Sequence, residues 1–254
     1  EPDRSALNSA GLVALDTDPQ TDPVLRDALT RIAAEHDTSV LVNARTAGTD
    51  GQVRNTNLMY TPSGKLQGVY SKQHLVPFGE YVPLRPLARL LSDRVEGIAR
   101  DMVPGTSAAP MTSGRLKVAN ALCFDVAYDD VLRSQVDRGA DLVVVQTSNA
   151  MFTGTAQREQ QWAISRARAV EVGRAVVVSS INGISGVIAP DGTVIERLPE
   201  TVAGSALVNV PLSTTTTPAT RIGPWPTRVA TIVAALALAA SMVTTRQAGR
   251  RRGD

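Results

Sequence analysis

The sequence predicts an α/β protein with two sheets in its core, followed by one transmembrane helix. Apolar runs typical of strands alternate with helical patterns over most of the chain, whereas the last strands follow one another as a meander. This mixture favours a two-sheet core over a single doubly wound sheet. An uncharged stretch near the C-terminus sets the final helix apart from the rest.

Composition narrows the possible functions. The 254 residues are 43% hydrophobic and carry a formal net charge of +2. Such a chain can bury one substantial core, and its charge indicates no affinity for nucleic acids. One cysteine excludes an internal disulfide and a cysteine-cluster metal site, and the two histidines, His36 and His74, leave little for a histidine-rich one. We therefore predict no metal and no other cofactor.

The first predicted elements are an apolar strand over residues 11–15, which ends at Asp16, and a helix after Asp22. A carboxylate at the end of such a strand stands where open α/β sheets hold functional groups, but it is also an ordinary turn residue. Asp22 is expected to cap the helix, with Pro23 at its first position. The expected apolar stripe comprises Val24, Leu25, Ala28, Leu29, Ile32 and Ala33.

The remaining pattern alternates strands and helices. Strands are expected at residues 39–43, 57–61, 66–71, 118–122, 141–147, 175–180, 186–189, 193–197 and 205–210, and helices at residues 127–138 and 156–172. The segment Thr61–Lys65 predicts a hairpin turn because proline and glycine punctuate it. Leucines and arginines alternate irregularly between residues 84 and 110. This pattern fits a lid or an arm on a membrane surface, and the alternative is a solvated helix that packs on its own domain.

Cys123 stands where an apolar strand meets a helical pattern, in V-A-N-A-L-C-F-D-V-A-Y. A thiol at this junction can be exposed at the sheet edge, and the positive end of the following helix favours the thiolate. Cys123 is therefore a candidate nucleophile. The other interpretation is a buried structural cysteine.

Two arrangements could activate this thiol. A Cys–His pair is common, and His74 is available for it because His36 lies at the end of the first helix. The second arrangement uses a carboxylate as base and a lysine ammonium that stabilises the thiolate and the oxyanion. Asp16, Lys72 and Glu80 would supply those groups. Both arrangements predict acyl transfer through a thioester.

The C-terminal region differs in kind from the rest. Seventeen uncharged residues separate Arg228 from Arg246, at the short end of what a spanning helix needs, and Trp225 stands as an interfacial anchor. The arginines that follow predict a cytoplasmic tail and a domain on the outer face. The stretch is rich in alanine, so a buried helix is the alternative. We place the domain at residues 1–222, the transmembrane helix at 223–246 and the tail at 247–254.

Five segments are distinctive: Y-S-K-Q-H-L-V-P-F-G-E-Y-V-P, C-F-D-V-A-Y, Q-T-S-N-A-M-F, Q-Q-W-A-I-S-R-A-R-A-V-E-V-G-R and I-N-G-I-S-G-V-I-A-P-D-G. Together, and in this order, they resemble apolipoprotein N-acyltransferase, the membrane-embedded branch of the nitrilase (carbon-nitrogen hydrolase) superfamily. The resemblance implies an α-β-β-α sandwich held on the outer face of a bacterial cell membrane by spans on both sides. The chain would lack the N-terminal spans and the first strand of the domain.

The resemblance also assigns roles to residues by motif. Cys123 would be the nucleophile, Lys72 the catalytic lysine and Glu80 the glutamate that supports the site. The backbone N–H of Phe124 would join Lys72 in the oxyanion hole.

Three positions depart from the family pattern. The family base is a glutamate, and Asp16 stands in its place; Asp125 likewise replaces a glutamate that follows the nucleophile, and Met151 stands near the place of a tryptophan. An aspartate is one methylene shorter than a glutamate, and a misplacement of about 1 Å can lower a rate on the order of 100-fold. The presence of aspartate rather than glutamate at position 16 therefore leaves open whether the chain is active.

The implied reaction moves an acyl chain from a phospholipid to Cys123 and then to the α-amino group of the diacylglyceryl-cysteine at the N-terminus of a lipoprotein. The alternative is a catalytically weakened, membrane-anchored homologue that binds lipid or a partner without turnover. A soluble nitrilase or amidase is disfavoured by the C-terminal stretch and by the L-V-P-F-G-E block.

Overall fold

The computed structural model describes residues 17–48, 52–91, 101–200 and 202–250. The strand expected over residues 11–15 and the candidate base Asp16 lie outside these ranges. The chain divides into two compact units, residues 1–215 and residues 216–254.

Helix α2 (Pro23–Glu35) begins as predicted. The Asp22 carboxylate accepts hydrogen bonds from the first free backbone N–H groups of the helix at 2.9 and 3.1 Å. The expected apolar stripe is wrong at two positions, because Val24 and Ile32 are exposed while Leu29 is buried. A helix that rests on a sheet of three strands has only a narrow line of contact, so residues beside that line stay in solvent.

An antiparallel sheet of three strands follows, made of β1 (Val40–Ala47), β2 (Val53–Tyr60) and β3 (Leu66–Ser71). Leu29 of α2 joins Leu58 and Tyr60 in a buried cluster on one face of this sheet. The predicted hairpin turn at Thr61–Lys65 connects β2 to β3, and Gly64 adopts a φ of +71° there. Strand β3 has the predicted bounds.

The second sheet has six strands: β4 (Met111–Ser113), β5 (Leu116–Leu122), β6 (Leu142–Ser148), β7 (Ala175–Ile181), β8 (Gly186–Ile188) and β9 (Val194–Arg197). Strands β5, β6 and β7 are parallel, and the outer pairs are antiparallel. The two parallel connections run through helices α4 (Asp129–Val136) and α5 (Gln157–Val172). Gly173 ends α5 with a φ of +63°.

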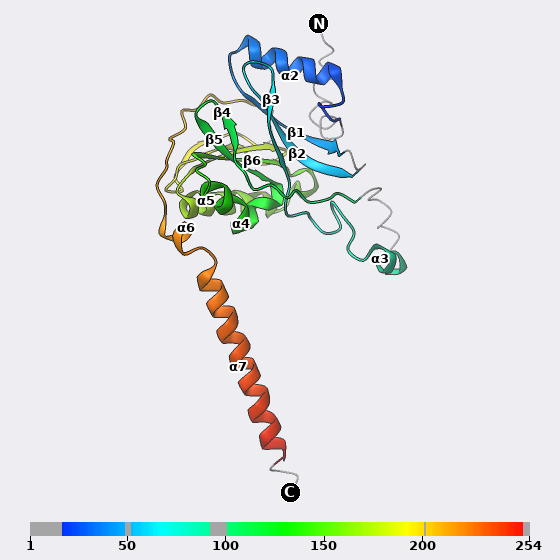
Figure 1. Cartoon of the computed structure of the whole chain (residues 1–254), viewed down its shortest axis with the longest axis vertical. Helices are drawn as coiled ribbons and strands as arrows, with labels where there is room; N and C mark the ends of the chain where they lie inside the picture. The colour runs from blue at the N-terminus through cyan, green and yellow to red at the C-terminus, as the bar shows by residue number, and fades with distance from the viewer. Residues whose placement is uncertain (1–16, 49–51, 92–100, 201, 251–254) are drawn as a thin grey trace. The chain divides into compact units, whose positions relative to one another are not determined.

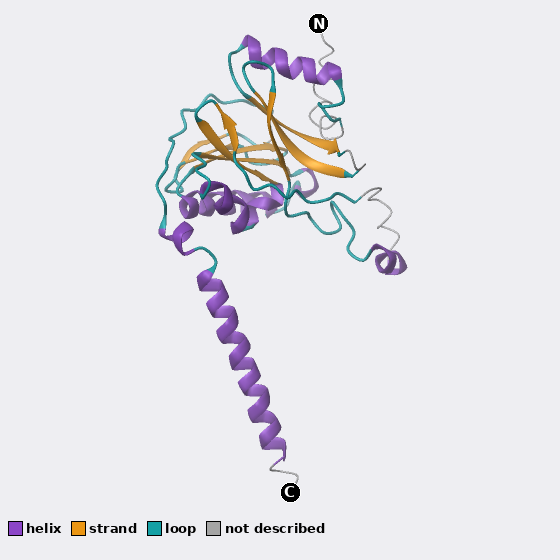
Figure 2. Cartoon of the chain, in the orientation of Figure 1, coloured by secondary structure: helices purple, strands orange, loops and turns teal. Residues whose placement is uncertain are grey.

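The two sheets face each other across a shared apolar layer. Met59 and Tyr70 of the first sheet are buried against Met111, Val118 and Leu122 of the second. Helix α2 covers the outer side of the first sheet, and α4 and α5 cover the outer side of the second (Figures 1 and 2). The α-β-β-α sandwich is therefore confirmed.

Buried amides also join the two sheets. Asn43 on β1 donates to Asn57 on β2 at 3.1 Å, and Asn57 donates across the sheet interface to Asn120 on β5 at 3.2 Å. The Gln135 side chain on α4 exchanges two 2.8 Å hydrogen bonds with the Asn120 backbone. Asn57, Asn120 and Gln135 are fully buried, so this network fixes how the layers align.

Two predicted elements differ from the structure. The helix expected from Ala127 is divided into a 3₁₀ helix at Cys123–Ala127 and α4, because Tyr128 adopts an extended conformation between them. The strand expected at residues 205–210 is absent from the described chain, and Leu207 is fully exposed. Alternating apolar residues form a strand only where a sheet edge supplies partners, and this segment pairs with none of the described strands.

The second unit contains helices α6 (Pro218–Ile222) and α7 (Trp225–Arg250). The hydroxyl of Thr217 caps α6 by accepting a hydrogen bond from the Thr220 N–H at 3.1 Å. Helix α7 has 26 residues, about 39 Å at the α-helical rise, which exceeds the thickness of a bilayer core. In the described part of the chain it is the one helix long and apolar enough to cross a membrane.

The asparagine network supports a stability prediction. Asn57→Ala removes the bridge between the sheets and leaves the buried side-chain oxygen of Asn120 without the donor that Asn57 supplies. We expect the free energy of unfolding to fall by about 2 kcal/mol. Urea titration of the full chain in detergent micelles, followed by tryptophan fluorescence, measures the change. The exposed Asn209→Ala is the control and should change stability by less than about 0.5 kcal/mol; equal effects of the two variants would contradict a bridging role.

Candidate active site

Cys123 lies at the carboxyl end of β5, where it opens the 3₁₀ helix. Its φ is +51°, a left-handed conformation that is uncommon for a residue with a side chain. Such backbone strain concentrates at functional sites because the surrounding structure must hold it in place. The thiol is partly exposed and lines a cavity of about 230 Å³.

Lys72 directly follows β3, and its side chain is 1% exposed. The Nζ atom lies 2.7 Å from Oε2 of Glu80, which neutralises the buried ammonium. Two backbone hydrogen bonds hold the residue, one from its N–H to the Asn55 carbonyl at 2.8 Å and one from the Gly105 N–H to its own carbonyl at 2.7 Å. A Cβ on Gly105 would lie 2.3 Å from the Ser71 carbonyl, so glycine is required for this close approach.

Glu80 is held in place from several sides. Besides the Lys72 ammonium, Oε2 accepts the backbone N–H of Val76 at 2.8 Å, and Oε1 accepts the Asn55 amide at 3.3 Å. The turn that places the Glu80 carboxylate beside Lys72 includes Phe78, whose φ is +59°. The glutamate therefore presents a fixed negative charge to the lysine.

The sulfur of Cys123, the ammonium of Lys72 and the carboxylate of Glu80 line the same cavity. Its other walls include polar side chains, Asn43, Arg45, Asn55, Gln146, Thr147 and Ser148, and apolar ones, Met102, Leu122, Met151 and Phe152. A thiol, a buried cation and a carboxylate around one cavity are groups that can support acyl transfer.

A second, more apolar cavity of about 410 Å³ borders Cys123 on the side of α5. Cys123, Val76 and Phe152 line both cavities. The remaining walls include Phe124, Val126, Ala127, Asn149, Gln161 and Ile164. The sulfur therefore borders two cavities, and the charged side chains of Lys72 and Glu80 line the first of them.

Asp125 is fully buried beneath the nucleophile turn. Its Oδ2 accepts the Tyr70 hydroxyl at 2.8 Å and the Leu122 N–H at 3.2 Å, and its Oδ1 accepts the N–H groups of Gln73 at 3.2 Å and His74 at 2.8 Å. Burial raises the pKa of the Asp125 carboxyl group, and these hydrogen bonds oppose the rise. Burial and the neighbouring carboxylate raise the pKa of Tyr70, which therefore remains a donor.

His74, the alternative activator, is engaged elsewhere. Its Nε2 lies 3.0 Å from the Asp130 carboxylate, and its ring stacks on Tyr128 at 3.7 Å between centroids. It lines a different cavity, which does not include Cys123. Asp18, the described carboxylate nearest in sequence to Asp16, accepts the backbone N–H groups of Gln20 and Ala47.

Several residues of the site carry no strong sequence signal. Asn55 holds Glu80, Asn149 and Gln161 form a hydrogen bond at 2.8 Å, and the Gln161 amide lies 3.7 Å from the Cys123 sulfur. Isolated amides occur on many surfaces, so only their position beside the candidate nucleophile distinguishes them. Only Asn55 has a sequence signal, because polar residues repeat within strand β2, on which it lies.

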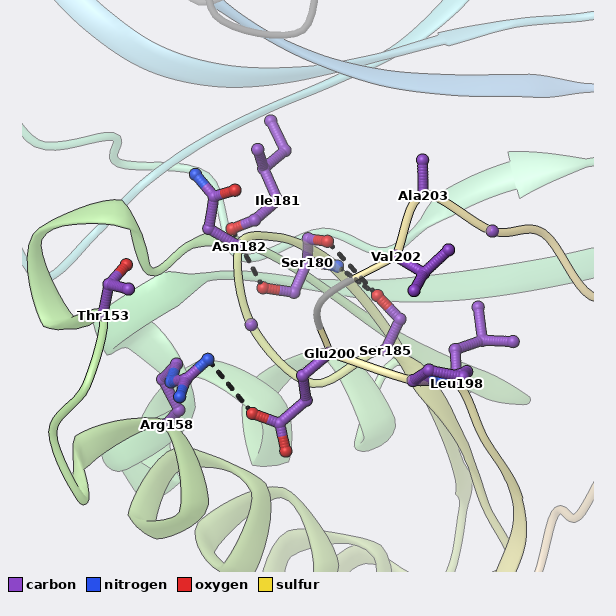
Figure 3. Close-up of a pocket in the computed structure, with 13 residues that line it drawn as sticks. Thr153, Arg158, Ser180, Ile181, Asn182, Ser185, Leu198, Glu200, Val202 and Ala203 are labelled. Carbon is purple, nitrogen blue, oxygen red and sulfur yellow. Dashed lines mark hydrogen bonds and ion pairs between the residues drawn. The ribbon is translucent and has the colours of Figure 1, made fainter.

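A larger cavity of about 560 Å³ is lined by Thr153, Arg158 and the end of β7 at Ser180 (Figure 3). The guanidinium of Arg158 faces the Glu200 carboxylate at 3.1 Å, and the Ser185 hydroxyl accepts the Ser180 N–H at 2.9 Å. Cys123, Lys72 and Glu80 do not line it. The described residues contain no group of three or more histidine, cysteine, aspartate or glutamate side chains placed to hold a metal.

Comparisons with known proteins identify the family to which the chain is similar. Residues 7–219 match the family model described as carbon-nitrogen hydrolase. Proteins named apolipoprotein N-acyltransferase are similar to the chain: that of Gloeobacter violaceus is 37% identical over 153 residues, which cover 60% of this chain and 29% of the relative. That of Mycolicibacterium smegmatis is 37% identical over 171 residues, which cover 67% and 28%. The chain spans about three tenths of each relative.

Solved structures show the same fold. The carbon-nitrogen hydrolase from Helicobacter pylori G27 superposes with a TM-score of 0.57 at 16% identity, covering 69% of this chain and 62% of that one. An amidase from Nesterenkonia sp. AN1, whose active-site cysteine undergoes Michael addition to acrylamide in one variant, gives 0.54 at 20% identity, covering 74% and 69%. The predicted resemblance is confirmed, and the chain belongs to the carbon-nitrogen hydrolase family.

Proposed function

We propose that this chain is the catalytic part of an apolipoprotein N-acyltransferase. It would take an acyl chain from a phospholipid and pass it to the α-amino group of a diacylglyceryl-cysteine at the N-terminus of a lipoprotein. The observation that carries the proposal is the single cavity lined by Cys123, Lys72 and Glu80. The similarity to relatives of that name supports the choice of substrates.

In this mechanism the Cys123 thiolate attacks the ester carbonyl carbon of the phospholipid. The Lys72 ammonium and the Phe124 N–H stabilise the oxyanion, and the lysophospholipid leaves with a proton. The lipoprotein amine then attacks the thioester, and the C–S bond breaks. Asp16 is the proposed base for both proton transfers, and Glu80 holds Lys72 in place.

The apolar features of the chain suit a lipid substrate. Leu84, Leu87 and Leu90 around helix α3 (Arg85–Leu91) are more than half exposed, as expected of an arm on a membrane surface. Helix α7 is proposed to span the membrane, with the globular domain on the outer face and the C-terminus in the cytoplasm. The proposed boundaries remain residues 1–222, 223–246 and 247–254.

The first test follows the thioester. We expect the full chain, incubated with phospholipid in micelles, to gain the mass of one acyl group, and hydroxylamine to remove it. Cys123→Ala should show no adduct, and Lys72→Met should slow acylation by about 100-fold or more because the oxyanion loses its cation. Intact-mass spectrometry measures both. No adduct on the wild-type chain would favour a homologue that binds lipid without turnover, and an adduct on Cys123→Ala would contradict the thioester.

A second prediction concerns Glu80. Glu80→Gln preserves the shape of the side chain but leaves the Lys72 ammonium, 1% exposed, without its charged partner. We expect acylation to slow by about 100-fold and the free energy of unfolding to fall by about 3 kcal/mol. Pre-steady-state acylation and urea unfolding provide the readouts. Glu196→Gln, on strand β9, is the matched control; if both variants acylate at the wild-type rate, Glu80 has no role in placing Lys72.

A third prediction concerns the base. Asp16→Glu restores the methylene that the family base has and should raise the acylation rate, by up to about 100-fold if the aspartate is misplaced by about 1 Å. Asp16→Asn should reduce the rate, since an amide cannot accept the thiol proton. A lower rate for Asp16→Glu than for wild type would show that Asp16 is not a shortened base.

A further inference from the structure

Gln161, on α5, points its side-chain amide at the candidate nucleophile. Its Nε2 atom lies 3.7 Å from Sγ of Cys123, a distance suited to an N–H···S hydrogen bond. In the described part of the chain this is the one side-chain hydrogen bond to the sulfur. The donor is partly buried in the wall of the apolar cavity, where water competes weakly for it.

Neighbouring side chains fix the orientation of this amide. The Thr147 hydroxyl donates to Oδ1 of Asn149 at 3.3 Å, and Nδ2 of Asn149 donates to Oε1 of Gln161 at 2.8 Å. Since a donor occupies the Gln161 oxygen, its NH₂ group must face the sulfur. Every hydrogen bond in this chain of three residues donates toward Cys123, so each bond polarises the next.

Asn149 itself has little freedom. It is 4% exposed, and its backbone N–H donates to the Ile181 carbonyl at 3.2 Å. A Cβ on Gly183 would lie 2.5 Å from its Nδ2 and 2.3 Å from the Ser180 hydroxyl. The loop after β7, which carries Gly183 and also borders the large cavity of Figure 3, therefore holds Asn149 against Gln161.

We propose that Gln161 stabilises the thiolate of Cys123 by hydrogen bonding, with Asn149 and Thr147 as positioning residues. The inference rests on the proposed role of Cys123 as nucleophile. When the base removes the Sγ proton, the negative charge on sulfur lies beside the Gln161 N–H. The sulfur electron pair then forms the C–S bond. When the amine displaces the thioester, that pair returns to sulfur and the same N–H stabilises the leaving group.

Cysteine alkylation tests this role without requiring lipid turnover, because Cys123 is the sole cysteine of the chain. The full chain in micelles is alkylated with acrylamide over a range of pH and followed by intact-mass spectrometry. Gln161→Leu should slow alkylation at neutral pH about tenfold and move the midpoint of the pH–rate curve upward by about one unit, with the rates converging at high pH.

Two further variants separate hydrogen bonding from packing. Gln161→Glu has the same shape but places a carboxylate beside the sulfur, so it should slow alkylation more than Gln161→Leu does. Asn149→Asp removes the donor to Gln161 and should produce a smaller shift in the same direction. Gln20→Leu, an exposed change in the loop before α2, is the control for a glutamine-to-leucine substitution and should match wild type.

Each outcome discriminates. A Gln161→Leu curve that superimposes on wild type, or falls equally at every pH, overturns the proposal, because the residue then only fills space. A wild-type thiol no more reactive than free cysteine at neutral pH overturns both this inference and the proposed nucleophile. If the midpoint depends on Gln161 but the chain takes no acyl group from phospholipid, the donor role of Gln161 is supported. The proposed substrate is then contradicted.

Discussion

The Asp125 carboxylate joins the two turns on which the site depends. Its oxygens accept hydrogen bonds from Leu122, next to the nucleophile, and from Gln73 and His74, which follow Lys72. A fourth bond comes from the Tyr70 hydroxyl on the facing sheet. Because all four donors converge on one buried group, the end of β5 and the end of β3 are held at a fixed separation. The strained backbone of Cys123 can persist because its turn is anchored in this way.

The charged groups of the site lie on one side of the sulfur. The Lys72 side of the cavity holds a buried ion pair, whose field acts strongly because little water screens it. The α5 side adds Phe124, Val126 and Ile164, which suit an alkyl chain. The proposed substrate is an ester with a charged head and an apolar tail. The carbonyl between the two parts would lie near Cys123, between the cation and the apolar wall.

Local signals predicted local structure well. Asp22 and Pro23 marked the start of α2, and the P-S-G turn marked the β2–β3 hairpin, because each acts through its own backbone. Features that depend on distant partners were not predictable. The segment at residues 205–210 has the pattern of a strand but pairs with no described strand. In the sequence, Gln161 is an ordinary polar residue of a helix, and only the fold places it beside Cys123. Motif order placed Lys72 with the nucleophile, which periodicity alone could not do.

Glu80 is an unsuitable proton acceptor for the proposed chemistry. Its carboxylate already accepts hydrogen bonds from the Lys72 ammonium, the Val76 N–H and the Asn55 amide. A proton on Glu80 would cancel the negative charge that pairs with the buried Lys72 ammonium, while in the proposed mechanism that ammonium stabilises the oxyanion. A glutamate so engaged is suited to hold the Lys72 ammonium in place. The proposed mechanism therefore takes its base from outside the F-G-E turn, at Asp16.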